Sequence, residues 1–292
     1  MFLKNEFKVK ILKDASLKEF CTFKIGGNAK FVFIVENTYS LVKMCRYCEQ
    51  NDIKFKVIGY GSNLLFSDLD FDGAIIVNRT SNVKMFGKSV WTDSGVSVST
   101  LIQKCIRKRL SGIEKLAGIP STVGGACVNS MGAFNVNFAD FVECVYCYNP
   151  QTDQFVKLTQ KDCNFEYRSS CFKSNNLVII GAKLRLKKDK KENIKARMID
   201  AIKTKNLTQP TNYHSAGSVF KRGSIIPAKV IDELGLKGFR VNDAEISKIH
   251  AGFIVNLNSA TSSDVKTLIS IIKQCVFDEF KQELETEIEF VE

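Results

Sequence analysis

The segment "YHSAGSVFKR", residues 213–222, places a hydroxyl among small residues just ahead of two cations. Ser218 can be a turn residue, a helix cap, a phosphate ligand or a proton donor. Lys221 and Arg222 could bind a diphosphate or a carboxylate, and their field would favour the release of a nearby proton. The segment alone leaves these four roles of Ser218 open.

A first glycine-rich segment, "VIGYGSNLL", ends a buried strand at Gly59 and Gly61. A dinucleotide-binding fingerprint requires a third glycine where Leu64 stands and a helix directly after it, whereas "LLFSD" continues as extended chain. Two interpretations remain. Either the turn holds a diphosphate with its amides and the side chains of Ser62 and Asn63, or it is an ordinary β-turn.

A second such segment, "GIEKLAGIPSTVGGACVNSMGAF", contains Gly118, Gly124, Gly125 and Gly132 and is almost uncharged. Glycine weakens regular structure by about 0.5–1 kcal/mol per position, so this density predicts that something must approach the backbone closely. A flat, bulky cofactor is a good candidate.

The ten cysteines raise the question of a metal site or a disulfide framework. Cys45 and Cys48 continue a helical apolar stripe, and Cys144 and Cys147 lie in a strand-like run that would turn them to opposite faces of a sheet. No secretory leader is recognisable at the start of the chain. We therefore expect reduced, buried cysteines, no bound metal and a cytoplasmic protein.

The net charge of +11 indicates an anionic partner without choosing between nucleic acid and a small substrate. The cations are scattered, and the one dense run, "KKDKKENIKAR", is typical of a solvated helix face. No window approaches the ~18 apolar residues of a membrane span. We expect neither nucleic acid nor membrane as a partner, and a monomer.

Apolar periodicity and turn residues predict the elements that position these segments. Helices are expected at 38–51, from Val98 after a cap at Ser97, at 189–205, from Pro227 to Gly235, and at 262–284. Strands are expected at "FKVIGYG", "GAIIV", "SVWTDS", "FVECVYCY", "QFVKL", "LVIIGAKLRL", "AGFIVN" and "LETEIEFVE". The early alternation of strands and helices suggests α/β layering, and a change of composition after Gln209 suggests a further domain.

Several motifs in order resemble one enzyme family. "TFKIGGNA", "GYGSNLL", "AGIPSTVGGA", "EYRSSCFK", "TQPTNYHSAGSVFKR", "GLKG", "ISKIHAGFIVN" and "LETEIEF" resemble the UDP-N-acetylenolpyruvoylglucosamine reductase family. The resemblance implies an α+β fold, with a two-part FAD-binding module of the vanillyl-alcohol-oxidase (PCMH) type and a C-terminal α+β substrate-binding domain. The implied divisions are 1–70, 71–205 and 206–292, and the last strand can return to the first subdomain.

The resemblance also implies an activity and a cofactor. Family members use NADPH to reduce FAD, which then reduces the enolpyruvyl ether of a UDP-sugar to UDP-N-acetylmuramate, a peptidoglycan precursor. The implied FAD-binding residues lie in the two glycine-rich segments: Gly59, Gly61, Ser62, Asn63, Leu64, Gly118, Ile119, Pro120, Thr122, Val123, Gly124, Gly125 and Ala126.

The implied catalytic residues are Arg168, Glu287 and Ser218. Hydride addition leaves negative charge on the substrate carboxylate, which a cation and a protonated carboxyl would stabilise, and a proton must then reach the adjacent carbon. Arg168 and Glu287 match the first two roles, and Ser218 matches the proton donor. Glu285 is a rival to Glu287, because the two share a face if they lie on a strand.

The resemblance further implies substrate contacts for Tyr167, Lys221, Arg222 and His250, although His250 is equally well explained as a structural histidine. Ser121 and Asn135 depart from the family pattern at positions that usually carry glycine, and both residue types tolerate turns. Two alternatives stay open. One is another FAD-dependent oxidoreductase acting on an alcohol or a sugar, and the other is a flavin-free nucleic-acid-binding protein.

Overall fold

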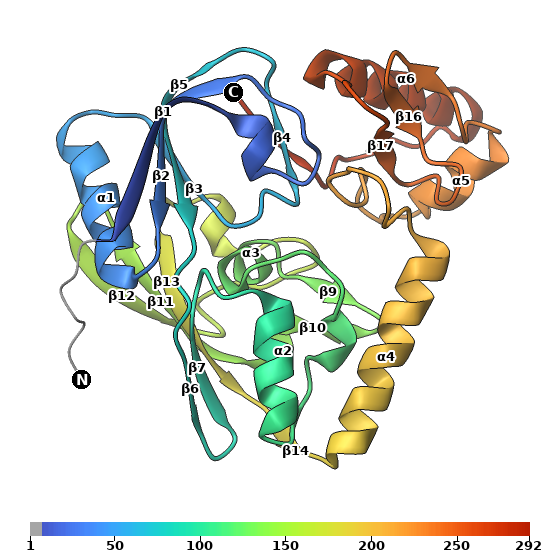
Figure 1. Cartoon of the computed structure of the whole chain (residues 1–292). Coiled ribbons are helices and arrows are strands. Elements are labelled where there is room, and N and C mark those ends of the chain that lie inside the picture. Colours follow the sequence, from blue (N-terminus) through green and yellow to red (C-terminus); the bar gives the residue numbers. More distant parts are fainter. Residues whose placement is uncertain (1–7) are drawn as a thin grey trace. The chain divides into compact units, whose positions relative to one another are not determined.

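A computed structural model describes residues 8–292 of the chain, which divide into two compact units (Figure 1). Of the described residues, unit 1 comprises 8–13, Phe31–Gly59 and Gly73–Thr204. Unit 2 comprises Asp14–Lys30, Tyr60–Asp72 and Lys205–Glu292. The chain therefore passes between the units several times, and each unit is built from segments far apart in the sequence.

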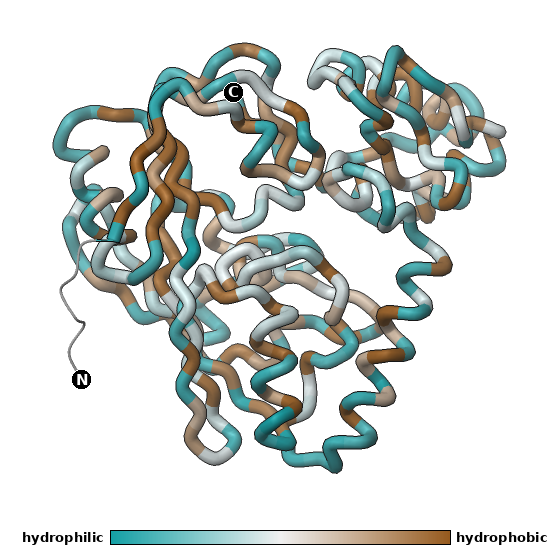
Figure 2. Tube along the Cα trace, viewed as in Figure 1, coloured by the Kyte–Doolittle hydropathy of each residue, from teal (hydrophilic) through white to brown (hydrophobic). Residues whose placement is uncertain are grey.

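The N-terminal sheet has the strand order β1-β2-β5-β3. Its strands are β1 (Val9–Ser16), β2 (Asn28–Val35), β5 (Phe71–Asn78) and β3 (Phe55–Ile58), with β3 parallel to β5. Helix α1 (Thr38–Gln50) begins at Asn37, whose side chain accepts a hydrogen bond from the Ser40 amide. Apolar side chains of α1, β2 and β5 form one core, and Figure 2 shows the hydrophobic colouring of these strands.

A five-stranded antiparallel sheet is the centre of unit 1, with the order β12-β11-β13-β7-β6. Its strands are β12 (Gln154–Thr159), β11 (Val142–Asn149), β13 (Val178–Arg185), β7 (Ser89–Asp93) and β6 (Val83–Phe86). Alternation along β11 sends Val145 and Cys147 into one core and Tyr146 and Tyr148 towards the α1 core. At β11, each face of the sheet therefore packs against a core.

Three helices contribute to the first of those cores: α2 (Val98–Arg107), α3 (Val123–Val128) and α4 (Lys191–Thr208). The side chain of Ser97 accepts a hydrogen bond from the Thr100 amide, so the predicted cap of α2 is confirmed. Helix α4 buries only a narrow stripe that includes Ile194, and most of its other side chains are charged or polar. A weakly amphipathic helix of this kind is held mainly by a few contacts along that stripe.

Unit 2 contains a small sheet, β15 (Arg240–Val241), β16 (Ala244–Ile246) and β17 (Ile254–Asn256), with α5 (Pro227–Glu233) and α6 (Ser262–Phe280). A capping box formed by Thr261 and Asp264 begins α6. Strand β4 (Leu64–Phe66) pairs in parallel with the last strand, β18 (Glu289–Val291). The C-terminal strand thus lies beside the first glycine-rich turn.

Two predicted boundaries in this unit are wrong. Helix α6 ends at Phe280 and not at Leu284, because Lys281 adopts a left-handed φ of 52° that ends the helix. The terminal strand covers only Glu289–Val291, so Glu285 and Glu287 lie before it and do not share the face of a regular strand.

The ten cysteines are all free thiols, and eight of them are buried. Burial raises the pKa of Cys48, Cys105 and Cys163 to about 12. Within residues 8–292, no three His, Cys, Asp or Glu side chains are grouped so that they could hold a metal ion. None of the helices in the same range is long and apolar enough to cross a membrane.

Candidate functional site

The two glycine-rich segments meet in unit 1 at Gly59 and Thr122. A Cβ atom on Gly59 would lie 2.4 Å from the Thr122 Oγ1 and 2.8 Å from its Cγ2, so only glycine fits there. The Arg79 guanidinium fixes the same turn by donating from Nη1 to the Gly59 carbonyl at 2.8 Å. The close approach expected from the glycine content is therefore present, between the segments themselves.

The second segment continues from Thr122 into α3, and its first amides are used within the protein. Val123 donates to the Val96 carbonyl at 2.9 Å and Gly124 to the Ser94 carbonyl at 2.8 Å. The Thr122 hydroxyl accepts from the Gly125 amide at 3.3 Å. Because these amides are occupied, the segment would hold a ligand through close packing against its backbone and not through these three N–H groups.

In unit 2, residues Gly61 to Leu64 form a tight turn closed by a 3.4 Å hydrogen bond from the Leu64 amide to the Gly61 carbonyl. Gly61 has a φ of 61°, and a Cβ there would lie 2.5 Å from the Phe20 carbonyl oxygen. The amides of Ser62 and Asn63 are at the centre of the turn and take no part in its closing bond. Such paired amides suit an anionic group.

Arg168 is held in an uncommon backbone conformation in unit 1. It lies at the tip of a hairpin in which Glu166 and Ser169 exchange hydrogen bonds of 3.0 and 3.2 Å, and its φ is 54°. A left-handed conformation costs a non-glycine residue roughly 1–2 kcal/mol, so the surrounding contacts must impose it.

Two contacts hold this hairpin to the second glycine-rich segment. The Arg168 Nη2 donates to the Gly132 carbonyl at 3.0 Å, and the guanidinium lies 5.1 Å from the centre of the Tyr167 ring. The buried Ser170 hydroxyl donates to the Val128 carbonyl at 2.7 Å. The predicted catalytic arginine is thus attached to the second glycine-rich segment, beyond the end of α3.

Ser218 lies in an extended segment of unit 2 between two other predicted motifs. Ser218 forms a β-bridge with Phe253, and the Val219 amide donates to the Gly252 carbonyl at 2.9 Å. On the other side, the Glu287 amide donates to the Val219 carbonyl at 2.7 Å. The main-chain segments that carry Ser218 and Glu287 therefore lie side by side, and the helix-cap role of Ser218 is excluded because no helix begins there.

His250 belongs to the loop on the Phe253 side of this segment. Its Nδ1 accepts a hydrogen bond from the Gly252 amide at 3.1 Å, which places the ring proton of the neutral form on Nε2. Burial, together with the nearby Lys237 and Arg222, lowers the pKa of His250 below its usual value. His250 is therefore neutral at pH 7 and can offer Nε2–H as a donor.

Glu285 and Glu287 differ in their surroundings. Glu285 forms an ion pair with Lys221, and its side chain is 73% exposed. Glu287 is half-buried, and both its amide and its carbonyl are hydrogen-bonded within unit 2. Arg222 is exposed.

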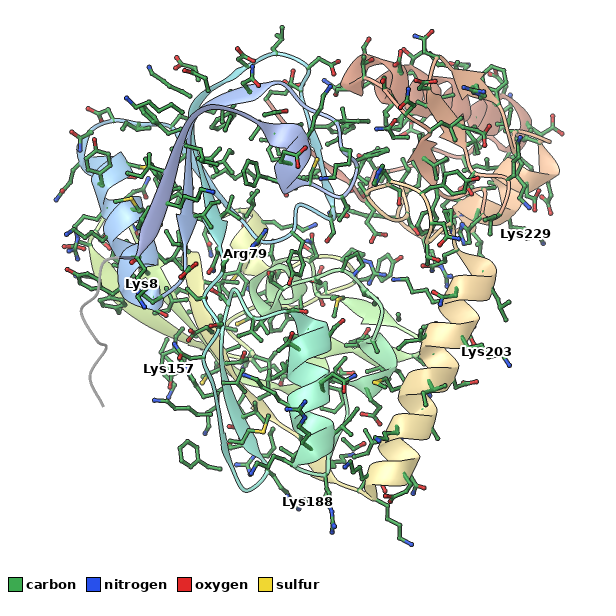
Figure 3. The ribbon with its side chains drawn as sticks, in the orientation of Figure 1. Lys8, Arg79, Lys157, Lys188, Lys203 and Lys229 are labelled. Carbon is green, nitrogen blue, oxygen red and sulfur yellow. The ribbon has the colours of Figure 1, made fainter. Side chains whose placement is uncertain are left out.

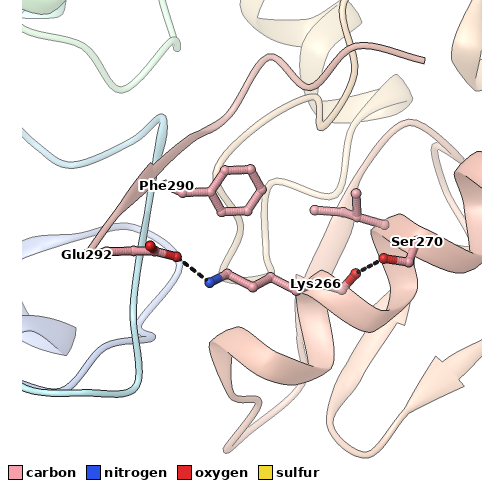
Figure 4. Close-up of a pocket in the computed structure, with 5 residues that line it drawn as sticks. Lys266, Ser270, Phe290 and Glu292 are labelled. Carbon is pink, nitrogen blue, oxygen red and sulfur yellow. Dashed lines mark hydrogen bonds and ion pairs between the residues drawn. The ribbon is translucent and has the colours of Figure 1, made fainter. Parts of the chain in front are cut away.

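The C-terminal strand that follows Glu287 is attached to α6 at a surface pocket lined by Lys266, Ile269, Ser270, Phe290 and Glu292 (Figure 4). Lys266 Nζ lies 2.8 Å from the Glu292 Oε1 and 5.7 Å from the centre of the Phe290 ring. The pocket contains none of the predicted site residues. Its contacts fix β18 and so anchor the chain just after Glu287.

Several supporting residues were missed by the sequence reasoning. Arg79, Ser170, and the carbonyls of Ser94 and Val96 all hold predicted site segments in place. Main-chain carbonyls leave no signal in a sequence, because every residue type carries one. Ser170, by contrast, stands in the motif "EYRSS" and could have been considered.

Comparison with known proteins identifies the family. The FAD binding domain family matches residues 29–154, which include the Gly59 turn and the segment 118–126. The family described as UDP-N-acetylenolpyruvoylglucosamine reductase, C-terminal domain, matches residues 209–291. A UDP-N-acetylenolpyruvoylglucosamine reductase of Caldicellulosiruptor saccharolyticus is 36% identical over 98% of this chain and 94% of its own. The chain belongs to the UDP-N-acetylenolpyruvoylglucosamine reductase family.

Other members of the family agree in sequence and in structure. The reductase of Thermotoga maritima is 37% identical over 92% of this chain and 94% of its own. The crystal structure of the reductase from Thermus caldophilus has a TM-score of 0.80 and 32% identity, and the match covers 98% of this chain and 99% of that one. The expected resemblance and the α+β fold with an FAD-binding module are confirmed.

As a member of this reductase family with an FAD-binding domain, the chain is an FAD-dependent oxidoreductase. The tight turn of Gly61 to Leu64, with the Ser62 and Asn63 amides at its centre, fits an anionic group of the cofactor. Because the chain matches the FAD binding domain family, the alternative of a flavin-free protein is excluded.

Proposed function

We propose that the protein reduces UDP-N-acetylglucosamine enolpyruvate to UDP-N-acetylmuramate in peptidoglycan precursor synthesis, with NADPH as the source of electrons. The names of its relatives support the substrate. The observation that carries the proposal is the hydrogen bond from the Glu287 amide to the Val219 carbonyl, because it brings an acid and a hydroxyl of the family motifs into one part of unit 2.

The bound flavin, once reduced by NADPH, would supply the hydride that the terminal carbon of the enolpyruvyl group receives. We assign the cofactor contacts to Gly59, Gly61, Ser62, Asn63, Leu64, Gly118, Ile119, Pro120, Thr122, Val123, Gly124, Gly125 and Ala126. In this assignment the turn of Ser62 and Asn63 receives the diphosphate, and the segment 118–126 packs against the flat part of the cofactor.

The residues of this chain stabilise the charge that develops on the substrate carboxylate. The Arg168 guanidinium supplies a positive charge, and a protonated Glu287 donates a hydrogen bond. Glu287 is half-buried. Glu285 is less suited to this role because it is exposed and paired with Lys221.

Ser218 delivers the proton to the carbon next to the one that received the hydride. A serine hydroxyl is a very weak acid in water, so the step depends on a strongly basic carbanion-like acceptor and on nearby cations. Tyr167, Lys221, Arg222 and His250 are proposed to contact the substrate, with the two cations suited to its diphosphate. The neutral His250 would contribute the Nε2–H donor.

The free thiols are consistent with a reducing compartment, and we place the reaction in the cytoplasm. We propose that the working form is a monomer, which size-exclusion chromatography with light scattering would test.

The decisive experiment separates the two half-reactions of Ser218→Ala by anaerobic stopped-flow absorption. We expect the bleaching of the flavin by NADPH to stay within about threefold, and the return of colour on addition of the enolpyruvyl UDP-sugar to slow by at least about 100-fold. Ser215→Ala is the matched control, because it removes a hydroxyl from the same segment and should change neither rate. Equal losses in both half-reactions of Ser218→Ala would remove the proton-donor role.

The same measurement distinguishes the alternative oxidoreductase. If the flavin were bleached by an alcohol or a sugar, and the enolpyruvyl UDP-sugar did not restore its colour without oxygen, the proposed substrate would be wrong while the flavin assignment stood.

A further inference from the structure

Three short segments of unit 1 that are distant in sequence form one strongly basic surface. Backbone hydrogen bonds join them: β14 (Lys187–Lys188) pairs with β8 (Leu110–Ser111), and the Leu186 amide donates to the Lys88 carbonyl at 2.9 Å. The Asp189 amide donates to the Arg109 carbonyl at 3.2 Å. We call this surface the basic tip, made of the exposed cations Lys88, Arg107, Lys108, Arg109, Lys187, Lys188 and Lys190.

The basic tip corrects the expectation that the cations are scattered and that the lysine run is only a solvated helix face. Seven cations stand in residues 88, 107–109 and 187–190, against one carboxylate, Asp189. Arg197 Nη2 forms an ion pair with Asp189 Oδ2 at 2.5 Å. The Asp189 carboxylate is therefore paired with a residue outside the tip. The tip therefore carries more than half of the net charge of +11 of the whole chain.

The cations of the tip are available to an external partner. None of the seven forms an ion pair with a carboxylate of residues 8–292. Lys188 Nζ does contact the Lys108 carbonyl at 3.1 Å, which leaves its charge uncompensated. Figure 3 labels Lys188 at this end of the unit, away from Arg79.

An aromatic side chain accompanies these charges. Phe86 ends β6 next to Gly87 at the tip of the β6–β7 hairpin and is 71% exposed. Lys88 follows Gly87 and is joined to Leu186 as described above. A phenyl ring at a hairpin tip among cations can enter the headgroup region of a bilayer, whereas recognition of nucleic acid would place aromatic rings as stacking faces along a groove.

We propose that the basic tip docks the protein reversibly on an anionic phospholipid membrane. Clusters of four to eight Lys and Arg side chains bind anionic leaflets, and an exposed aromatic residue adds apolar contact. The proposal replaces the expectation that the protein has no membrane partner. It concerns surface attachment, and it does not depend on the reaction proposed above.

The test is co-sedimentation of the full-length, flavin-loaded protein with vesicles at about 0.15 M ionic strength, where weak surface charge effects are screened. Vesicles of phosphatidylcholine alone are compared with vesicles that also contain phosphatidylglycerol. We expect binding to the second kind only. The triple variant K187E/K188E/K190E should weaken it at least about tenfold, and Phe86→Ser by about threefold.

The matched control is K157E/K203E/K229E, which makes the same change in net charge at exposed lysines outside the tip (Figure 3). It should retain binding within about threefold. Equal losses in the two triple variants would overturn the proposal, because net charge and not the tip would then be responsible. Tip-dependent binding to single-stranded DNA, with none to anionic vesicles, would overturn it as well.

Folding of the tip variants is checked by flavin content and thermal midpoint. Because none of the changed residues lies in the proposed cofactor or substrate sites, both should match the parent protein. If K187E/K188E/K190E were unstable, Phe86→Ser with Lys108→Glu would serve as the second variant, with the same expected loss of vesicle binding.

Discussion

The Asn63 side chain donates a 3.0 Å hydrogen bond to the main-chain carbonyl of Glu287, and the Glu289 amide donates back to the Asn63 carbonyl at 2.9 Å. Glu287 is thereby fixed on both sides, because its own amide donates to Val219. The turn assigned to the cofactor diphosphate and the carboxyl assigned to catalysis are thus parts of one hydrogen-bonded arrangement. We therefore expect a change in the turn to alter the position of Glu287.

Replacement of Asn63 tests this link. Asn63→Ala removes the donor to the Glu287 carbonyl but keeps the main-chain amide of the turn. We therefore expect the rate of flavin reduction by NADPH to stay within about threefold. The second half-reaction should slow about tenfold, which corresponds to an activation free energy higher by about 1.4 kcal/mol. A double-mutant cycle with Glu287→Gln gives the control. The double variant should be no slower than Glu287→Gln alone, and fully additive losses would show that Asn63 does not act through Glu287.

Gly59→Ala tests the meeting of the two glycine-rich segments. The added methyl would lie 2.4 Å from the Thr122 Oγ1, so we expect a loss of about 1–3 kcal/mol in the free energy of unfolding and weaker flavin retention on dialysis. Gly223→Ala is the matched control, since no atom lies within 4 Å of the position that its Cβ would occupy and it should change neither quantity. Full flavin retention by Gly59→Ala would show that the contact with Thr122 is not required for cofactor binding.

Ser170→Ala tests how Arg168 is positioned. Loss of the 2.7 Å hydrogen bond leaves the Val128 carbonyl without this buried donor, which costs about 1–3 kcal/mol and loosens the Arg168 hairpin. We predict a slower second half-reaction with an unchanged first one, measured by stopped flow, and partial recovery in Ser170→Thr. A variant that is destabilised but keeps both rates would assign Ser170 a purely structural role.

The ion pair of Glu114 and Arg197 should make the stability of the protein depend on pH in the acidic range. Burial alone would raise the pKa of Glu114, but hydrogen bonds from the Gly112 and Glu114 amides and from Arg197 lower this pKa below its usual value. A carboxyl with a lowered folded-state pKa contributes stability that is present above the unfolded-state pKa and is lost as the pH falls through the folded-state value.

We therefore predict that Glu114→Gln lowers the thermal midpoint at pH 7 and that the difference from the parent shrinks as the pH falls below about 4, the range in which an ordinary glutamate takes up a proton. The difference in thermal midpoint is measured by thermal unfolding, followed by circular dichroism, at pH values from 7 down to below about 4. A constant difference across the whole range would mean that hydrogen bonding, and not charge, accounts for the effect.

Much of the fold could be predicted because its signals are local. Periodicity and a capping serine located α2, and Pro227 marked the start of α5. The end of α6 was missed because Lys281 has no glycine-like signature, although it adopts the left-handed conformation. The pairing of strands could not be predicted either, because the register between strands that are distant in sequence cannot be read from one sequence alone.

The site, like the fold, could be predicted only in part from the sequence. Ser218 and Glu287 were expected from motifs, and the structure brings their segments together through Val219. Their supporting contacts are main-chain carbonyls, which residue types do not reveal. The basic tip was missed for a related reason: "RKR" and "KKDK" look like separate runs until β8 and β14 pair.

The pairing of β18 with β4 also constrains how the protein is made. Strand β4 is synthesised early, yet its parallel partner, Glu289–Val291, lies at the far end of the sequence. The nascent polypeptide therefore cannot assemble the Glu287 region until β18 has left the ribosome. A chain cut short before Glu289 would keep nearly all of this sequence and lack this strand, so the proposed role of Glu287 predicts that it would be inactive.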